Sequence, residues 1–234
     1  MITLLVLGGS GRTGKHVLTQ AVERGHRVRA LGRNPDSVSA PAGVELVAGT
    51  PSRIDDIRRA ADGVDAVVSA LNNSRASDNP WAKPVSPPMF MTDATRDTLT
   101  VMNENGIRRL SVASTLGAGD SWRTLNPLFK GLIKTSGIRH GYTDHHGVDE
   151  VVRASDAEWV MARSVALTDA PPRGPLRAAL AGAEKPGLSI SRVEVARFLL
   201  DALQDDTWLR QAPLIWNQRA PRDASTRTPL SGRN

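Results

Sequence analysis

Cysteine is absent from this chain of 234 residues. Its absence excludes disulfide bonds, thiolate metal ligands and a cysteine nucleophile, and it fits a reducing environment. The sequence also has no apolar run long enough to span a membrane. The apolar run at residues 2–7 is too short for a signal peptide, and no basic segment precedes it. We therefore expect a cytoplasmic protein without a membrane partner.

A basic recognition helix is missing as well, although the formal net charge is +6. Half of this charge comes from residues 217–234, which contain four arginines and one aspartate. The segment lacks apolar periodicity and carries two prolines, so we predict a basic, flexible tail. A solvated tail explains the charge without a nucleic-acid partner, and we expect none.

The strongest signal lies in the first fourteen residues. Residues 2–7 are typical of a short β-strand, and residues 15–24 carry apolar side chains at the spacing of a helix with one buried face. The turn between them contains Gly8, Gly11 and Gly14. A strand, a glycine-rich turn and a helix in this order are typical of a dinucleotide-binding unit.

The three glycines have different mechanical roles in such a unit. One allows a sharp turn, one lets backbone N–H groups approach a pyrophosphate, and one lets the helix pack closely on the strand. The helix N-terminus then presents unpaired N–H donors and a positive dipole end to the phosphates. The alternative is a tight turn in an α/β protein that binds no nucleotide.

The residue after the second predicted strand distinguishes between two cofactors. NAD enzymes usually place a carboxylate there to bind the ribose 2′-hydroxyl. This chain has Arg33 and no carboxylate before Asp36. A guanidinium can bind the 2′-phosphate of NADP with two hydrogen bonds, and Arg12 inside the glycine turn can join it. We therefore predict NADP(H) as the cofactor, the alternative being a solvated loop arginine.

Further strands and helices alternate along the chain. Strands are predicted at residues 27–31, 44–48, 66–71, 110–114 and 158–163, with helices at 53–61 and 89–105. This alternation predicts an α/β fold with a doubly wound parallel sheet and a small C-terminal substrate-side region. We expect one domain over residues 1–216, of which 1–115 mainly bind cofactor and 116–216 mainly face the substrate.

Loops after the fourth and fifth strands are the expected site, because ligands bind beyond the carboxyl ends of such strands. These loops contain Trp81 and Trp122, two of only five tryptophans. A flat substrate suits indole faces, although both rings can equally well cover the core. Between residues 126 and 155 the pattern is helical, with a possible break near Gly137 or Gly141, and Ser191 is a candidate N-cap for a helix at 192–203.

Three residues are candidates for catalysis. Tyr142 and His146 are four residues apart on a predicted helix and therefore share a face, and Ser114 ends a central strand. This arrangement is similar to the Ser and Tyr-x-x-x-Lys set of short-chain dehydrogenases, with His146 in place of the lysine. The alternative is a surface tyrosine and a structural histidine. Adjacent helical residues point apart, so we expect no metal at Asp144, His145 and His146.

Several segments together carry a family resemblance. They are the glycine turn, Arg33, the pair Ser114-Thr115 and residues 144–155, 159–169 and 188–198. They resemble the atypical short-chain dehydrogenase/reductases with an NAD(P)H-binding domain, of the biliverdin reductase B and flavin reductase type. The resemblance extends to about Trp216.

The resemblance implies a set of binding residues. The pyrophosphate would lie against Gly8, Ser10, Gly11, Arg12, Thr13 and Gly14, and the 2′-phosphate against Arg33. Leu71 and Asn72 would border the ribose, and Ser114 and Thr115 would lie beside the nicotinamide. Three positions depart from the family pattern, namely Thr50 after the third strand, Ser164 after Arg163, and Ala166 where biliverdin reductases carry a histidine.

Three functions follow from these observations. The first is an NADPH-dependent reductase acting on a small flat aromatic acceptor such as a flavin or quinone, as a monomer or homodimer. The second is a non-catalytic NADP-sensing regulator of the NmrA-like kind. The third, a sugar-nucleotide epimerase or dehydratase, needs a working Tyr/Lys pair and ranks last.

Overall fold

The computed structural model describes residues 1–34, 40–77 and 79–218. The strands are β1 (Thr3–Leu7), β2 (Arg27–Gly32), β3 (Val44–Ala48), β4 (Ala66–Ser69), β5 (Arg109–Thr115), β6 (Glu158–Ser164), β7 (Ala166–Thr168), β8 (Leu176–Ala179), β9 (Ser189–Ser191) and β10 (Leu214–Asn217). The helices are α1 (Arg12–Glu23), α2 (Ile54–Ala61), α3 (Phe90–Glu104), α4 (Pro127–Thr135), α5 (Arg139–Arg153) and α6 (Arg192–Asp201), with 3₁₀ turns η2 (Gly119–Thr124) and η3 (Asp206–Trp208).

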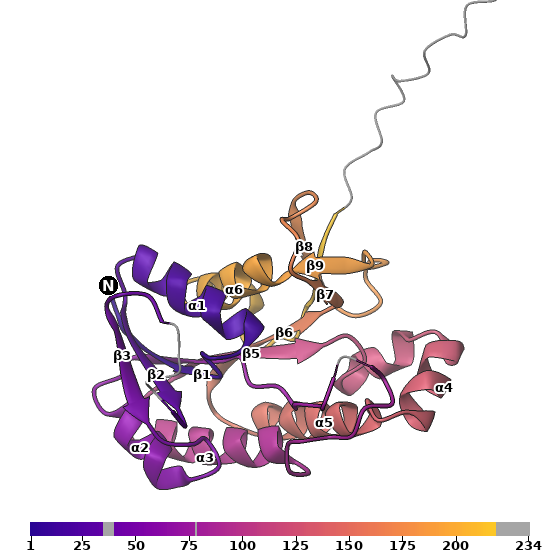
Figure 1. Ribbon diagram of the computed structural model, residues 1–234. Helices are drawn as coiled ribbons and strands as arrows, with labels where there is room; N and C mark the ends of the chain where they lie inside the picture. Colours follow the sequence, from indigo (N-terminus) through magenta and orange to yellow (C-terminus); the bar gives the residue numbers. More distant parts are fainter. Residues whose placement is uncertain (35–39, 78, 219–234) are drawn as a thin grey trace, which may run out of the picture.

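An eight-stranded sheet in the order β3-β2-β1-β4-β5-β6-β10-β8 forms the centre of the molecule (Figure 1). All pairings in it are parallel except the one between β10 and β8. The order reverses between β1 and β4, which is the topological switch point where doubly wound sheets bind ligands. The predicted doubly wound α/β fold is confirmed.

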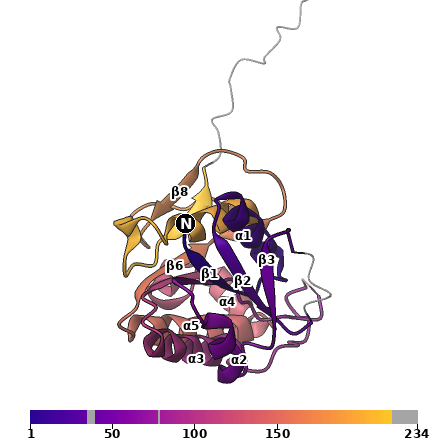
Figure 2. The ribbon, with the colours of Figure 1, turned by 90° about the vertical axis from the view of Figure 1, so that its left-hand side faces the viewer.

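Helices cover both faces of the sheet, as Figures 1 and 2 show. Helices α1 and α6 pack on one face over a core that includes Leu4, Val6 and Leu18. Helices α2, α3 and α5 pack on the other face, where Leu5 and Leu7 contribute to a second core. Alternate residues of β1 thus enter opposite cores, which explains why a central parallel strand is apolar throughout.

Several element boundaries differ from the sequence-based prediction by one to three residues. Helix α1 begins at Arg12, three residues earlier than predicted. The helical stretch between residues 126 and 155 is divided into α4 and α5 by Ser136, Gly137 and Ile138, at the first of the two predicted break points. A Cβ on Gly137 would lie 2.6 Å from the carbonyl oxygen of Ala82. The helix therefore breaks where the loop after β4 packs against it.

The C-terminal elements bring three further corrections. Strands β7 and β8 were not predicted, because short strands in a segment rich in proline and glycine carry no periodic signal. Ser191 precedes α6 but does not cap it through its side chain, and its N–H instead donates to Oδ1 of Asn217. Asn217, placed in the tail by the sequence, is a buried residue of β10. Residues 219–234 of the predicted tail lie outside the described residues.

Candidate functional site

The glycine turn lies at the switch point of the sheet. Gly8 has a φ of +80°, a conformation that L side chains rarely adopt. A Cβ at Gly8 would lie 2.7 Å from the carbonyl oxygen of Ala70, which follows β4. The turn can therefore pass this closely over the end of β4 only with glycine at position 8.

Gly14 lets helix α1 approach the turn. A Cβ there would lie 2.0 Å from the carbonyl oxygen of Gly8, so no other residue fits without a shift of the backbone. Gly11 precedes the helix and provides no side-chain cap, and the first turn of α1 has no acidic residue. The N-terminus of α1, with Ser10 exposed and Thr13 half-buried beside it, is thus open to an anion.

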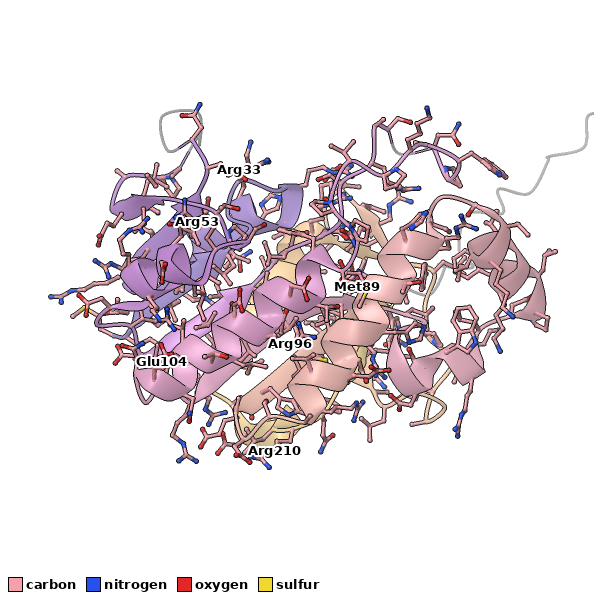
Figure 3. The ribbon with its side chains drawn as sticks, turned by 90° about the horizontal axis from the view of Figure 1, so that it is seen from below. Arg33, Arg53, Met89, Arg96, Glu104 and Arg210 are labelled. Atoms are coloured by element: carbon pink, nitrogen blue, oxygen red, sulfur yellow. The ribbon has the colours of Figure 1, made fainter. Side chains whose placement is uncertain are left out.

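Two arginines flank this turn. Arg33 is exposed after β2, at the periphery of the molecule (Figure 3). Arg12 lies at the start of α1, and its guanidinium is 3.9 Å from the carboxylate of Asp169. The same carboxylate accepts a hydrogen bond of 2.7 Å from Arg192, whose side chain is nearly buried. Asp169 therefore links the glycine turn to the segment between β7 and β8.

The end of β4 presents polar groups next to the turn. Leu71 is buried and Asn72 is exposed. The side-chain amide of Asn73 donates a hydrogen bond of 2.8 Å to Asp144 of α5, while its Oδ1 is buried without a partner among the described residues. Sequence reasoning named Asn72 and missed Asn73, because only the packing of α5 shows which amide turns inward.

Asp144 explains how α5 and α3 are joined. Its carboxylate is fully buried and accepts hydrogen bonds of 2.8 Å from the backbone N–H groups of Met91 and Thr92, in the first turn of α3. A carboxylate at this position satisfies helix N–H groups and complements the helix dipole. Within the described residues no group of three or more side chains is suited to hold a metal ion.

The end of β5 holds the residues predicted to lie beside the nicotinamide. Ser114 is buried, and its carbonyl oxygen accepts a hydrogen bond of 3.0 Å from the hydroxyl of Ser164 on β6. Its own hydroxyl is buried without a partner among the described residues, so it does not bond to Tyr142 or His146. Thr115 is half-buried at the same edge.

Tyr142 and His146 lie on one face of α5, as their spacing predicts, and both contact the loop after β5. The phenol of Tyr142 donates to the carbonyl oxygen of Leu116 over 3.3 Å. Burial raises the pKa of Tyr142, although a hydrogen bond with the side chain of Thr115 opposes the shift. His146 accepts a hydrogen bond of 3.1 Å at Nδ1 from the N–H of Gly119. Their roles in catalysis stay a prediction.

His145, between them in sequence, is a further site candidate. The residue as a whole is partly exposed, but its Nδ1 is buried and has no partner among the described residues. Burial lowers the pKa of His145 to about 4, against the opposing charge of Asp144. The imidazole is therefore neutral at pH 7. The sequence offered two adjacent histidines and no signal to choose between them.

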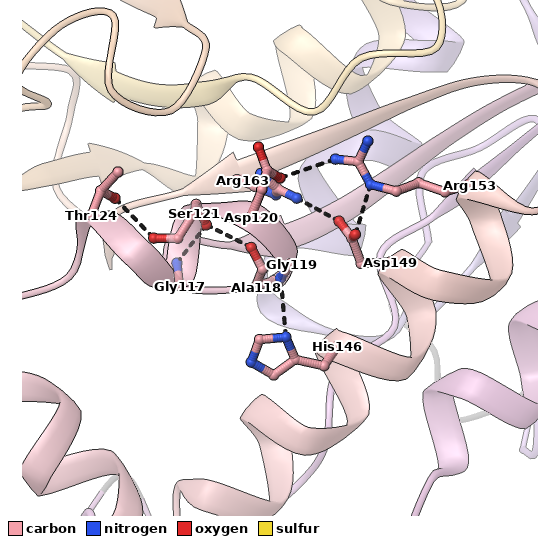
Figure 4. Close-up of polar contacts among 10 residues, drawn as sticks. All are labelled: Gly117, Ala118, Gly119, Asp120, Ser121, Thr124, His146, Asp149, Arg153 and Arg163. Carbon is pink, nitrogen blue, oxygen red and sulfur yellow. Dashed lines mark hydrogen bonds and ion pairs between the residues drawn. The ribbon is translucent and has the colours of Figure 1, made fainter.

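A charge network around the buried Arg163 fixes the loop after β5 (Figure 4). Arg163 of β6 is fully buried and lies 2.5 Å from Asp149 and 2.6 Å from Asp120. Arg153 reaches the same two carboxylates, at 2.7 Å and 3.1 Å. Gly119 fits tightly between them, because a Cβ there would lie 2.4 Å from the carboxylate of Asp149. The sequence showed these charges but not their proximity.

Trp122 and Trp81 differ in their surroundings. Trp122 is half-buried and meets Tyr142 and His146 edge-on, with ring centroids 6.4 Å and 5.7 Å away. Trp81 is 66% exposed on the long loop after β4. Trp122 therefore belongs to the aromatic cluster beside β5, whereas Trp81 lies at the surface.

These features fit a dinucleotide. The turn requires glycine where a side chain would fill the space above β1 and β4, and α1 begins without a side-chain cap. Asn73 after β4, Ser114 at the end of β5 and His145 on α5 each have a buried polar atom without a partner among the described residues, namely Oδ1, Oγ and Nδ1. Buried polar groups are normally paired, so these three atoms are candidate partners of a polar ligand.

Comparison with protein families agrees with this reading. Residues 8–206 match the model of the NAD(P)H-binding family, and the chain belongs to that family. The chain is accordingly an NAD(P)H-binding protein.

Two solved structures illustrate the likeness. An anaerobilin reductase from Escherichia coli O157:H7 has a TM-score of 0.76 and 17% identity, covering 94% of this chain and 98% of its own. A short-chain dehydrogenase/reductase from Veillonella parvula, solved in complex with NADP, has a TM-score of 0.74 and 15% identity, covering 94% and 99%. At such identities the likeness shows the fold.

Curated relatives match only a part of the chain. A photosystem II assembly factor Ycf39 from Trieres chinensis is 37% identical over 79 residues, which are 33% of this chain and 24% of the relative. The chain thus matches about a quarter of that protein's length. In the part of the chain that the structure describes, no helix has the length and apolar character needed to cross a membrane.

Proposed function

We propose that this protein is an NADPH-dependent reductase that acts on a small flat acceptor, such as a flavin or a quinone. The proposal rests on the glycine turn, together with buried atoms of Asn73, Ser114 and His145 that have no partner among the described residues. Leaving each polar group unpaired costs roughly 1–3 kcal/mol. A bound ligand that pairs with them recovers this cost.

NADP is preferred over NAD in this proposal because of Arg33. It follows β2 at the place where NAD enzymes carry a carboxylate, and neither Arg33 nor Asn34 is acidic. A guanidinium matches the geometry and charge of a 2′-phosphate. The neighbour solved in complex with NADP supports the same choice.

The cofactor, when bound, supplies a hydride, and the acceptor takes one proton from solvent. The protein's contribution is then mainly to position the two partners and exclude water. Tyr142 stays protonated because burial raises its pKa, and it donates to Leu116. We assign Ser114, at the centre of the edge, to binding beside the reacting ring.

A non-catalytic NADP-sensing regulator is the second candidate. One observation favours it: Tyr142 and His146 both form hydrogen bonds with the backbone of the loop after β5. A regulator needs a cofactor-binding site but no side chains that take part in a reaction. It predicts tight binding of NADPH without turnover.

Steady-state oxidation of NADPH with a panel of flavins and quinones separates the two. Turnover with one or more acceptors supports the reductase. Binding of NADPH in a titration, with no turnover for any acceptor, supports the regulator. The variant Ser114→Ala is expected to lower kcat while leaving the Kd of NADPH unchanged, and an unchanged kcat would limit Ser114 to packing.

A further inference from the structure

Exposed hydrophobic side chains are concentrated along one edge of the sheet. Large hydrophobic side chains are exposed at nine positions of the described chain. Seven of them lie in the connections that lead from β4 to α3, from β5 to α5 and from β6 to α6. The other two are Met1 and Val193, the second of which lies in the first turn of α6. Single exposed hydrophobic residues are normal, but their concentration in neighbouring connections indicates an interaction surface.

Two of these connections touch each other. A Cβ on Gly137, which lies between α4 and α5, would be 2.6 Å from the carbonyl oxygen of Ala82 and 3.0 Å from that of Pro80. Trp81 lies between these two residues and is therefore close to the C-terminal end of α4. Figure 1 shows the loop after β4 and helix α4 side by side, at the end of the molecule opposite α2. The two connections thus form one continuous surface.

Helix α4 presents both hydrophobic and basic side chains to solvent. Leu128 is 84% exposed and Phe129 is exposed as well, whereas Ile133 is buried against the protein. Lys130 and Lys134 are four residues apart and therefore share one side of the helix. The helix is thus amphipathic on its outer surface, in addition to the face that it buries.

The fold fixes the orientation of α4. The side chain of Asn126 caps the helix by accepting a hydrogen bond of 2.8 Å from the N–H of Leu128. The ammonium of Lys130 donates to the carbonyl oxygen of Arg123 over 3.4 Å and lies 5.8 Å from the centre of the Trp122 ring. With Ile133 buried, these contacts hold the outer side chains of the helix at the surface.

The charge of this surface decides what partner it suits. Residues 121–139 contain no aspartate or glutamate and four cations, namely Arg123, Lys130, Lys134 and Arg139. In a two-fold contact between copies of the chain the same patch meets itself, so these cations would face one another. Hydrophobic side chains, an exposed indole and cations together suit an anionic bilayer, where the first two enter the interface and the cations attract lipid phosphates.

We infer that a docking face consisting of Trp81, Leu128, Phe129, Lys130 and Lys134 binds the surface of an anionic lipid bilayer. The inference does not depend on the proposed reductase reaction, since binding to vesicles is measured without NADPH or an acceptor. It departs from the expectation that the protein has no membrane partner. That expectation rested on the lack of a spanning segment, and docking on a bilayer surface requires none.

Co-sedimentation of the full chain with lipid vesicles is the first test. Vesicles of phosphatidylcholine alone are compared with vesicles of equal parts phosphatidylcholine and phosphatidylglycerol. We expect binding to prefer the vesicles with phosphatidylglycerol, and the preference to shrink at high salt because exposed charges are screened. Equal binding to both kinds of vesicle, or none to either, would overturn the inference.

The double variant Lys130→Gln/Lys134→Gln tests the basic part of the docking face. We expect it to weaken binding to the anionic vesicles roughly 30-fold, about a factor of five for each lysine near the surface. Arg222→Gln/Arg227→Gln removes the same charge from the basic C-terminal segment and is the matched control. It should keep most of the affinity, and an equal loss in both double variants would contradict the role of α4.

Entry of the hydrophobic side chains is measured by quenching of tryptophan fluorescence with lipids brominated on their acyl chains. We expect the wild type to be quenched and Trp81→Phe to lose most of the quenching. Trp208→Phe, a half-buried tryptophan in η3, is the control and should keep it. Leu128→Ala should weaken binding roughly tenfold, because it removes hydrophobic area from the interface. Binding of the wild type without quenching would contradict entry into the bilayer.

A second copy of the chain is the remaining occupant to test. Sedimentation velocity without lipid measures the oligomeric state of the wild type and of Leu128→Ala. A dimer that this variant dissociates, together with no binding to vesicles, would assign the docking face to self-association and overturn the inference.

Discussion

The backbone N–H of Gly119 donates to Nδ1 of His146 over 3.1 Å, and this bond ties the loop after β5 to helix α5. An imidazole that accepts at Nδ1 and is neutral carries its proton on Nε2. Arg163 and Asp149 hold the same loop from the other side. We therefore expect His146 to act as a fixed support of the site, whereas Nδ1 of His145 is buried without a partner among the described residues.

Replacing His146 tests this assignment. We expect His146→Ala to lower the free energy of unfolding by about 1 kcal/mol, the net value of one hydrogen bond. We expect His146→Asn to restore most of it, because the amide oxygen can accept from Gly119. Urea denaturation measures both. A loss of activity on the scale of general acid–base catalysis, roughly 10²–10⁴-fold, with unchanged stability would make His146 catalytic instead.

Gly8 and Gly25 form a matched pair for testing the turn. Their φ angles are +80° and +77°, but a Cβ at Gly8 meets Ala70 whereas one at Gly25 meets nothing within 4 Å. Gly25→Ala is expected to lower the free energy of unfolding by about 1 kcal/mol, the cost of a left-handed backbone conformation for alanine, and to leave NADPH binding unchanged. Gly8→Ala is expected to cost about 2 kcal/mol more and to abolish binding in a calorimetric titration. Equal effects would show that close packing at the switch point is unimportant.

His145 predicts a particular dependence of stability on pH. Its folded pKa of about 4 lies below the ordinary value of 6.5, so the unfolded chain binds this proton first as the pH falls. The free energy of unfolding should therefore fall between pH 6.5 and 4, by up to about 3 kcal/mol. His145→Asn should flatten this part of the profile, while His140→Asn, at an exposed position of the same helix, should not. Identical profiles for His145→Asn and the wild type would contradict the burial of this imidazole.

We expect Arg33 to determine the choice between NADP and NAD. Arg33→Ala should weaken NADPH binding by roughly 1.5–3 kcal/mol, the value of a charge-assisted contact, and affect NADH much less. Arg27→Ala removes an exposed arginine from the opposite end of the same strand and should affect neither. Calorimetric titration with both cofactors measures the difference. Equal losses for NADPH and NADH would exclude a contact with the 2′-phosphate.

The fold could be predicted because its signals are local. Each of these signals is contained in one short segment of the chain: the apolar runs of β1 and β4, the glycine turn, and the helical spacing of α1. Their alternation then restricts the topology to a parallel sheet with crossover helices. Strand β8 escaped prediction because it pairs with β10, which lies more than thirty residues away.

The candidate site could be predicted only in part, since its second half depends on packing. The glycine turn is contiguous in sequence, but Asn73 meets Asp144 across 71 residues and Asp120 meets Arg163 across the loop and α5. The Tyr142 and His146 pair had the correct spacing, yet both hydrogen bonds turn toward backbone carbonyl and amide groups. The orientation of α5 about its axis decides which of the two adjacent histidines contacts the loop after β5. The sequence does not specify this orientation.

We propose that this protein directs hydride transfer from NADPH to a bound flat acceptor at the carboxyl end of β5. The test is NADPH oxidation with FMN, riboflavin or a quinone, using two forms of NADPH. Each form carries deuterium in place of one of the two hydrogens on C4 of the nicotinamide. We predict turnover that slows for one deuterated form and not for the other, because a fixed site presents one face of the nicotinamide ring to the acceptor. Absence of turnover with every acceptor, or equal slowing by both forms, would contradict it.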